Sequence, residues 1–252
     1  MKYTIALACL FFGLYSWGQG TYTPLNTDSY HEMDRLDIQY GEILPMPHTS
    51  VKPYNKKWLA EYAESMYNSN IDLSPQTSFN LEYILNDNSE WVDSFNVSKK
   101  PLWKIIYPER ASLFSVNTKA FTLRLNPVVQ MHFAPELDNK LTFNIVRGFE
   151  LRAYIKKRLG FYFHLGSTLM RYPSFVRDER VNRTFENVPG EGYFKTYKEN
   201  GQDYFSTRGY MTFNVIEHLD FQFGYDKNFI GNGYRSMLLS DNAAASLFLK
   251  MN

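Results

Sequence analysis

Cysteine, catalytic motifs and long apolar runs are almost missing from this chain of 252 residues. Its one cysteine, Cys9, lies in a segment that we expect to be removed on export, which excludes disulfides, cysteine-bound metals and thiol catalysis from the mature protein. No GxSxG, HExxH or P-loop pattern occurs, and the histidines lack the spacing of a metal site. We therefore expect no enzyme activity, no cofactor and no metal.

A strong net charge is also lacking. The formal net charge is +1, which argues against a general nucleic-acid binder. Beyond the first residues no apolar run is long enough for a membrane helix, so any membrane crossing must be made by strands. Aromatic residues, by contrast, make up 17% of the chain, and both the aromatic girdles of membrane barrels and sugar-stacking surfaces are rich in them.

Residues 1–20 have the pattern of a secretory signal peptide. Lys2 supplies the charged start, residues 5–15 form an apolar run too short to span a bilayer, and small residues follow near Gly20. Leu-Ala-Cys at residues 7–9 faintly resembles a lipoprotein cleavage site, but cleavage there would leave too short an apolar run. We expect an exported protein with a cleaved signal.

Residues 21–115 predict a small helical and irregular region. Residues 55–69 place Trp58, Tyr62 and Met66 at helical spacing, and a weaker helical pattern covers residues 80–85. Trp58 and Tyr62 are candidates for a ligand surface, although aromatic residues four apart on a helix more often belong to a core, which is the interpretation we favour. The region is expected in the periplasm or as a plug inside a barrel.

Residues 116–252 alternate between apolar and polar side chains, a period that predicts strands. Runs begin at Phe121, Leu141, Phe161, Phe205, Leu219 and Ser246, and Pro127 costs one of them a ladder hydrogen bond. Several runs reach the ~9–11 residues of a tilted membrane strand. The expected fold is mainly β: an antiparallel outer-membrane β-barrel with about six strands present, fewer than a closed single-chain barrel needs. We expect either the front part of a longer protein or a barrel closed by several chains.

Loop lengths predict how such a barrel is oriented. Residues 156–160 and 217–218 are tight turns, as at a periplasmic rim, whereas residues 172–203 and 226–245 are long loops, as on the outer face. One residue breaks the alternation: Arg147 falls among the lipid-facing positions, where a midplane arginine costs about 2–4 kcal/mol. The adjoining Gly148 suggests a bulge that turns Arg147 away.

Two sets of polar and aromatic residues are candidates for ligand binding. Arginine forks suit carboxylates and aromatic faces suit sugar rings, so an acidic polysaccharide is a reasonable ligand for the first long loop; a solvated loop with locally paired charges is the alternative. The second loop has oxygen ligands without the spacing of a known calcium loop, and turn chemistry explains its Asn and Gly residues better. The candidates are Arg177, Arg180, Arg183, Tyr193, Tyr197, Asp226, Asn228, Asn232, Tyr234, Arg235 and Asp241.

A third set consists of charged residues on the inward parity of the strands. These residues predict a ladder of charged side chains along the inside of the barrel. In a filled barrel such charges are usually structural, whereas in an open barrel they select the solute that passes. They are Arg124, His132, Glu150, Arg152, His164 and Arg208.

Three segments carry a resemblance to a known family. They are YHEMDRL at residues 30–36, HTSVKPY at residues 48–54 and, most specifically, GYDKNFIGNGYRSMLLSDN at residues 224–242. With them the chain resembles the capsule-assembly Wzi-type outer-membrane family, in the form found among gliding Bacteroidetes. The resemblance covers residue 30 to the end and implies a large monomeric barrel with helices on the periplasmic side. It also implies a surface lectin that holds capsular polysaccharide or, in the gliding branch, a protein linked to motility.

Three functions follow as hypotheses. The first is an outer-membrane protein that binds surface polysaccharide for capsule assembly or retention. The second is a gliding-motility or adhesion component, and the third is a porin-like or enzymatic barrel. The expected partners are polysaccharide and outer-membrane lipid, possible contacts include gliding or secretion machinery, and nucleic acid is not expected.

Overall fold

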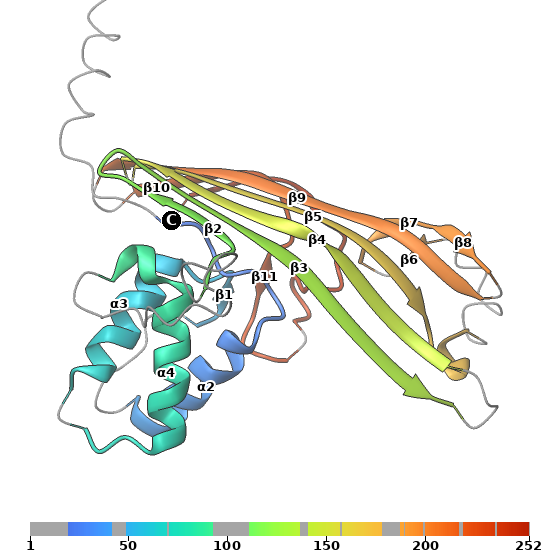
Figure 1. Cartoon of the computed structure of the whole chain (residues 1–252), viewed down its shortest axis with the longest axis horizontal. Helices are drawn as coiled ribbons and strands as arrows, with labels where there is room; N and C mark the ends of the chain where they lie inside the picture. Colours follow the sequence, from blue (N-terminus) through green and yellow to red (C-terminus); the bar gives the residue numbers. More distant parts are fainter. Residues whose placement is uncertain are drawn as a thin grey trace, which may run out of the picture.

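The protein has a long antiparallel sheet with a bundle of helices packed beneath one end (Figure 1). The computed structural model describes residues 20–41, 49–69, 71–92, 111–136, 141–156, 158–177, 187–188, 190–198, 200–216, 219–234 and 236–251. Of the expected signal segment, only Gly20 belongs to these residues. Within the described ranges, no helix combines the length and apolar character that a membrane crossing requires.

The helical unit contains α2 (Asp28–Tyr40), α3 (Lys56–Tyr67), α4 (Pro75–Asp87) and the short 3-10 helix η2 (Ser89–Trp91). Asn55 caps α3 by accepting a hydrogen bond from the Lys57 backbone N–H, and Ser74 caps α4 in the same way with proline at the first turn. The prediction of α3 is confirmed. α4 is longer than the predicted patch, and α2 was not predicted.

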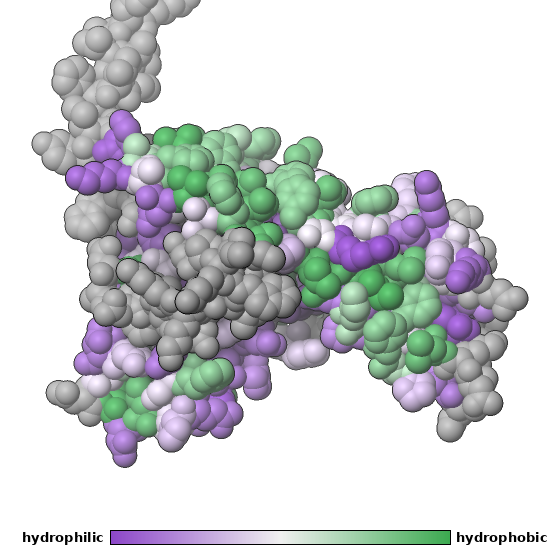
Figure 2. Space-filling model, viewed as in Figure 1, coloured by the Kyte–Doolittle hydropathy of each residue, from purple (hydrophilic) through white to green (hydrophobic). Residues whose placement is uncertain are grey.

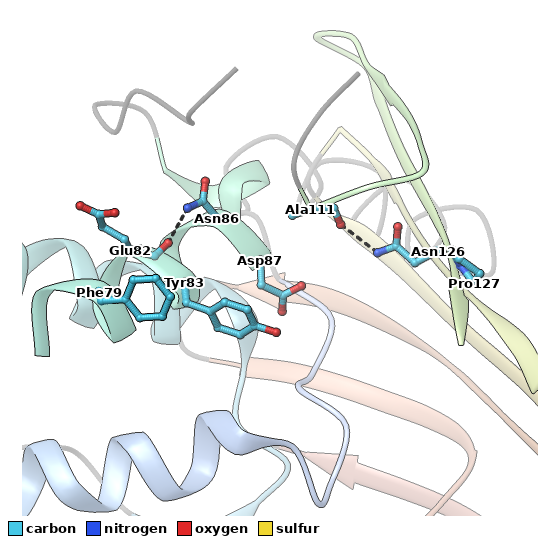
Figure 3. A pocket seen from close by; sticks show the side chains of 8 residues that line it. All are labelled: Phe79, Glu82, Tyr83, Asn86, Asp87, Ala111, Asn126 and Pro127. Carbon is cyan, nitrogen blue, oxygen red and sulfur yellow. Dashed lines mark hydrogen bonds between the residues drawn. The ribbon is translucent and has the colours of Figure 1, made fainter. Parts of the chain in front are cut away.

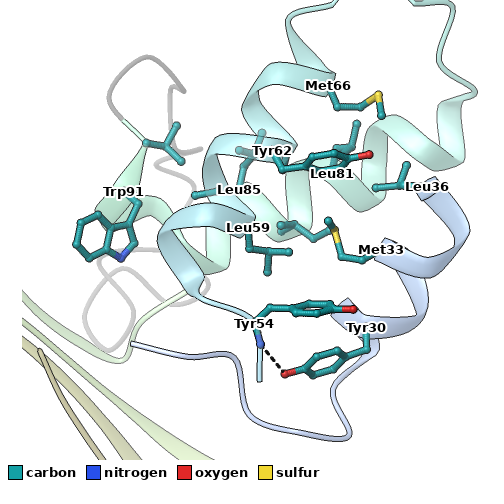
Figure 4. Packing of buried hydrophobic residues seen from close by; sticks show 14 of the residues in the cluster. Tyr30, Met33, Leu36, Tyr54, Leu59, Tyr62, Met66, Leu81, Leu85 and Trp91 are labelled. Atoms are coloured by element: carbon teal, nitrogen blue, oxygen red, sulfur yellow. Dashed lines mark hydrogen bonds between the residues drawn. The ribbon is translucent and has the colours of Figure 1, made fainter. Parts of the chain in front are cut away.

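The core of the helical unit lies between the three helices (Figure 4). Met33 from α2, Leu59 from α3 and Leu81 from α4 are completely buried. Tyr62 is buried as well, and Trp58 packs against it with ring centroids 5.9 Å apart. The expectation that this aromatic pair belongs to the core is confirmed.

The large sheet has the strand order β12-β10-β9-β5-β4-β3-β2, with β8 beside β9. All its pairings are antiparallel, so the coarse prediction of a mainly β, antiparallel fold is confirmed. The described strands form an open sheet, with β12 and β2 at the two ends of this order. The strands are β2 (Phe114–Asn117), β3 (Phe121–Pro135), β4 (Leu141–Ile155), β5 (Leu159–Arg171), β8 (Lys195–Tyr197), β9 (Gly201–Ile216), β10 (Leu219–Asp226) and β12 (Ser246–Met251).

Arg147 stays on the apolar side of β4. β4 pairs with β3 and with β5 without any shift of register, and Arg147 lies opposite Val129 and Ser167 with its side chain exposed. The prediction of a bulge at Gly148 is therefore wrong. A Cβ atom at Gly148 would collide with the carbonyl oxygen of Leu165, so glycine permits close approach of β5 instead.

The two faces of the sheet differ in character. Odd-numbered residues of the long strands point away from the helices, and Figure 2 shows hydrophobic residues gathered over the strands while hydrophilic ones predominate on the visible helical surface. The pattern matches the alternation read from the sequence. The exposed apolar residues of this outer face include Phe121, Val129, Met131, Phe133, Leu141, Phe149, Ile155, Phe163, Phe205, Met211, Phe213, Phe223, Leu247, Leu249 and Met251.

The two long loops contain short strands that alternation did not reveal. The first loop holds β6 (Asn187–Val188), β7 (Gly192–Tyr193) and β8, and β9 starts at Gly201. The second holds β11 (Phe229–Ile230), which pairs with β1 (Val51–Lys52) from the helical unit. The second loop is therefore bound to the helices beneath the sheet, which loop length alone did not predict.

Candidate functional site

The helical unit covers the inner, even-numbered face of the sheet near its tight turns. The Tyr210 hydroxyl accepts a hydrogen bond from the Tyr22 backbone N–H at 2.7 Å, and the hydroxyls of Thr21 and Tyr154 are also 2.7 Å apart. Trp91 meets the ring of Tyr154 edge to face, with centroids 5.2 Å apart. The helical unit is thus fixed against the inner face of the sheet, and we call it the plug below as a name for this position only.

Buried charges join the plug to the sheet. The Glu90 carboxylate on η2 lies 3.1 Å from Arg124 Nε on β3 and 3.5 Å from Arg152 Nη1 on β4. All three side chains are at most 3% exposed. Buried charges are tolerated only when they are paired, so this cluster fixes the plug at one position on the inner face.

Asp87, at the end of α4, belongs to the same cluster. Its carboxylate lies 2.7 Å from Lys56 Nζ and 3.6 Å from Arg152 Nη2. Desolvation by burial acts to raise the pKa of Asp87, but the two cations outweigh it and hold that pKa well below its usual range. Asp87 is therefore charged at neutral pH and neutralised by its neighbours.

The predicted inner charge ladder forms only in part. Arg152 Nε lies 3.7 Å from the Glu150 carboxylate. His164 on β5 lies directly opposite Glu150 on β4 and Arg208 on β9. His132 is exposed on β3, away from the plug contacts. Two arginines of the ladder, Arg124 and Arg152, bind plug carboxylates, which are partners that the strand pattern could not show.

The two long loops bind each other. Lys227 Nζ donates hydrogen bonds to the Glu191 carboxylate at 2.7 Å and to the Asp241 carbonyl oxygen at 3.1 Å. A Cβ atom on Gly190 would lie 3.0 Å from the Asn242 carbonyl oxygen, so the loops also touch through their backbones. The first loop is thereby fixed to the second.

The second loop is in turn anchored to the plug. Besides the β1–β11 pairing, the Gly231 backbone N–H donates to the Ser50 carbonyl at 2.7 Å. Lys52 Nζ lies 5.3–5.7 Å from the ring centroids of Tyr30, Tyr54 and Phe229, which together form a cation–π cage. The loops and the plug therefore form one connected unit.

Three of the predicted ligand-binding residues present their side chains to solvent. Tyr193 is 87% exposed and Tyr234 is 92% exposed, and Asn232 is exposed in the same loop as Tyr234. Tyr197 is half-buried, with Lys198 Nζ 5.4 Å above its ring. These residues come from the two loops that the Lys227–Glu191 contact joins. The second loop, which carries Tyr234, turns back to the plug through β11, so the two predicted sets are linked but do not share the far end of the sheet.

Other predicted residues have structural partners or lie elsewhere. Arg177 forms an ion pair with Glu136 at 3.1 Å and so links the β3–β4 and β5–β9 connections. Asp226 is buried and accepts a hydrogen bond from the Lys227 backbone N–H, whereas Asn228 is half-buried. Asp241 contributes its backbone oxygen to Lys227. Arg180, Arg183 and Arg235 fall outside the described residues.

Sequence reasoning missed the residues that connect the plug to the sheet. Asp87 is the last residue of α4 and Glu90 lies just beyond it in η2, in a polar segment where the sequence carries no pattern that marks either residue as buried. In the described part of the chain, no three His, Cys, Asp or Glu side chains come together as a metal-binding group. Comparison with protein families, with curated proteins and with solved structures found no match to this chain.

Proposed function

We propose that this protein is part of an outer-membrane β-barrel whose outer loops hold surface polysaccharide for capsule assembly or retention. The observation that carries the proposal is the exposed apolar face of the sheet, opposite a polar inner face that contacts the plug. Lipid offers no hydrogen-bond partner for backbone groups, so every backbone N–H and C=O in the membrane must be paired within the protein. An antiparallel sheet with an apolar outer face meets this requirement once its edge strands are also paired.

The orientation follows from the two ends of the sheet. β5 follows β4, and β10 follows β9, after very short connections, whereas the opposite end carries the two long loops. In outer-membrane barrels short turns face the periplasm, so the plug lies on the periplasmic side and Tyr193, in the first long loop, faces outwards. Tyr234 lies in the second loop, which is bound both to the plug and to the first loop.

Polysaccharide binding is assigned to the exposed tyrosines of the two long loops. An exposed aromatic face stacks on a sugar ring, and Tyr193 and Tyr234 lie in loops that are held to the sheet and plug by Lys227 and β11. A fixed pair of aromatic residues loses little conformational freedom on binding. The resemblance to the capsule-assembly family agrees with this role.

Membrane insertion is tested first. The full mature chain is refolded into lipid vesicles and into detergent-free buffer, and association is followed by flotation. Insertion predicts flotation with vesicles and protection of the strands from protease, while a freely soluble monomer in buffer would refute the barrel.

Polysaccharide binding is tested with the vesicle-inserted chain. Acidic capsular polysaccharide is added, and binding is compared between the unaltered chain and the variants Tyr193→Ala and Tyr234→Ala. Each loss of an aromatic face is expected to weaken binding about five- to ten-fold. Phe175→Ala, which also removes an exposed aromatic ring, serves as the matched control. Equal binding by all variants would contradict the assignment to these tyrosines.

A further inference from the structure

A cavity lies between α4 and the middle of β3 (Figure 3). Its volume is about 470 Å³, within the range of small-molecule sites. Phe79, Glu82, Tyr83 and Asn86 line it from α4, and Asn126 and Pro127 line it from the sheet. None of these residues takes part in the loop site.

Two aromatic rings on α4 are exposed beside this cavity. Phe79 is 66% exposed and Tyr83 is 63% exposed, although both belong to a helix whose other face is fully buried through Leu81 and Leu85. They are four residues apart and therefore lie on one face of α4. Adjacent exposed aromatic residues at a cavity mark a binding surface more often than a core.

The polar groups of the cavity are mainly hydrogen-bond acceptors. Asn86 Nδ2 donates to the Glu82 backbone carbonyl at 2.7 Å, while Asn86 Oδ1 is buried and has no hydrogen-bond partner among the described residues. The Asn126 side chain is already used by Ala111 and Leu113. Because Asn86 Oδ1 is buried, it offers no surface to a ligand. The partly exposed Asp87 carboxylate and the Tyr83 hydroxyl instead point into the space between α4 and β3 (Figure 3), where they would accept hydrogen bonds from the hydroxyl groups of a ligand.

The charges of the cavity restrict the ligand further. Glu82 and Asp87 are carboxylates, and Asp87 is already neutralised by Lys56 and Arg152. An anionic ligand would be repelled by Glu82, and the described residues that line the cavity include no arginine or lysine. Planar aromatic faces with acceptors at their rim instead suit an uncharged ring that carries several hydroxyl groups.

We propose that this cavity binds uncharged sugar units of a glycan, stacked on Phe79 and Tyr83 and hydrogen-bonded to Asp87. This site is separate from the loop site and differs from it in ligand class, since the loop site is proposed for acidic polysaccharide. Only its position on the periplasmic side depends on the proposed function; the binding itself does not.

The test uses the full mature chain in detergent and isothermal titration calorimetry. The probes are maltohexaose, cellohexaose and mannohexaose as uncharged glycans, trigalacturonate as an anion and the glucosamine hexamer as a cation. At least one uncharged probe is expected to bind, and Phe79→Ala and Tyr83→Ala are each expected to weaken it at least five-fold. Ile38→Ala, which shortens an exposed apolar side chain on α2, is the matched control and should leave binding unchanged.

Several outcomes would overturn the proposal. It fails if no uncharged probe binds, if trigalacturonate or the glucosamine hexamer binds more tightly than all of them, or if the Phe79 and Tyr83 variants bind like the control. Because both residues are exposed, their loss leaves the core intact, which circular dichroism checks. A loss of binding in Tyr193→Ala but not in Phe79→Ala would assign the glycan to the loops and reject the cavity.

Discussion

Replacement of Glu90 by glutamine should separate the plug from the sheet. The substitution keeps the shape of the side chain but removes the carboxylate that lies within 3.5 Å of both Arg124 and Arg152. Removing one partner from a buried ion pair costs about 3–5 kcal/mol, because the remaining charge stays in a poorly solvated place. Arg152 keeps Asp87 and Glu150 as partners, so we expect the lower end, about 3 kcal/mol.

The assay is urea unfolding in detergent micelles, followed by tryptophan fluorescence. Trp91 lies at the contact itself, 5.2 Å from the ring of Tyr154, so its emission reports separation of the plug. With an urea dependence of about 2 kcal/mol per molar, a loss of 3 kcal/mol moves the plug transition by roughly 1.5 M.

The control is Glu61→Gln, which removes an exposed carboxylate 3.7 Å from Lys57 on α3. An exposed pair contributes at most about 1 kcal/mol, so its transition should scarcely move. Arg124→Gln and the double variant complete a cycle, in which we expect a coupling of about 1–3 kcal/mol between Glu90 and Arg124. The reasoning would be refuted if Glu90→Gln lowered the unfolding free energy no more than Glu61→Gln does. It would also be refuted if the losses of the Glu90 and Arg124 variants simply added up in the double variant.

Three further predictions concern acid, close packing and the apolar face. The pKa of the Asp87 carboxyl is lowered in the folded state. Its contribution to the free energy of unfolding is therefore complete at a pH above the ordinary pKa of about 4, and it is lost as the pH falls towards the folded-state pKa. Asp87→Asn should thus weaken the plug contact at pH 7 by about 1 kcal/mol, since the side chain is 37% exposed, and should flatten the acid dependence of urea unfolding. Gly148→Ala should destabilise the β4–β5 pairing by about 1–3 kcal/mol in a thermal melt, because the added Cβ meets the backbone of Leu165, whereas Ser167→Ala should be neutral. Arg147→Leu should stabilise the vesicle-inserted chain by up to about 2–4 kcal/mol in urea titrations, and a destabilised variant would argue against lipid contact at this position.

The strands were predictable because their signal is local. Alternation from Phe121 onward placed β3, β4, β5, β9, β10 and β12, and the face of each side chain follows directly from a period of two. The helix α3 was equally clear from its apolar spacing and its Asn55 cap. α2 was missed because its buried residues Tyr30, Met33 and Leu36 are separated by charged ones, and only contact with the other helices makes that stripe a core.

The exposed tyrosines of the site could be proposed from composition, but their joint position could not. Tyr193 and Tyr234 are far apart in sequence, and only the contact between Glu191 and Lys227 joins the two loops that carry them. Arg177 was a candidate because arginine suits anionic ligands, but it forms an ion pair with Glu136. Whether an arginine is free or paired depends on residues distant in sequence, which a single sequence does not reveal.

The sequence by itself therefore determined the mainly β, antiparallel architecture, the helix α3 and the apolar outer face, because each depends on side-chain periodicity within one segment. The tertiary structure alone decided that the second long loop pairs with the helical unit, that Arg147 stays on the outer face, and that Glu90 joins two strands through buried arginines. These features depend on register and on long-range burial, and the energy of a buried charge depends on which partner the fold brings to it.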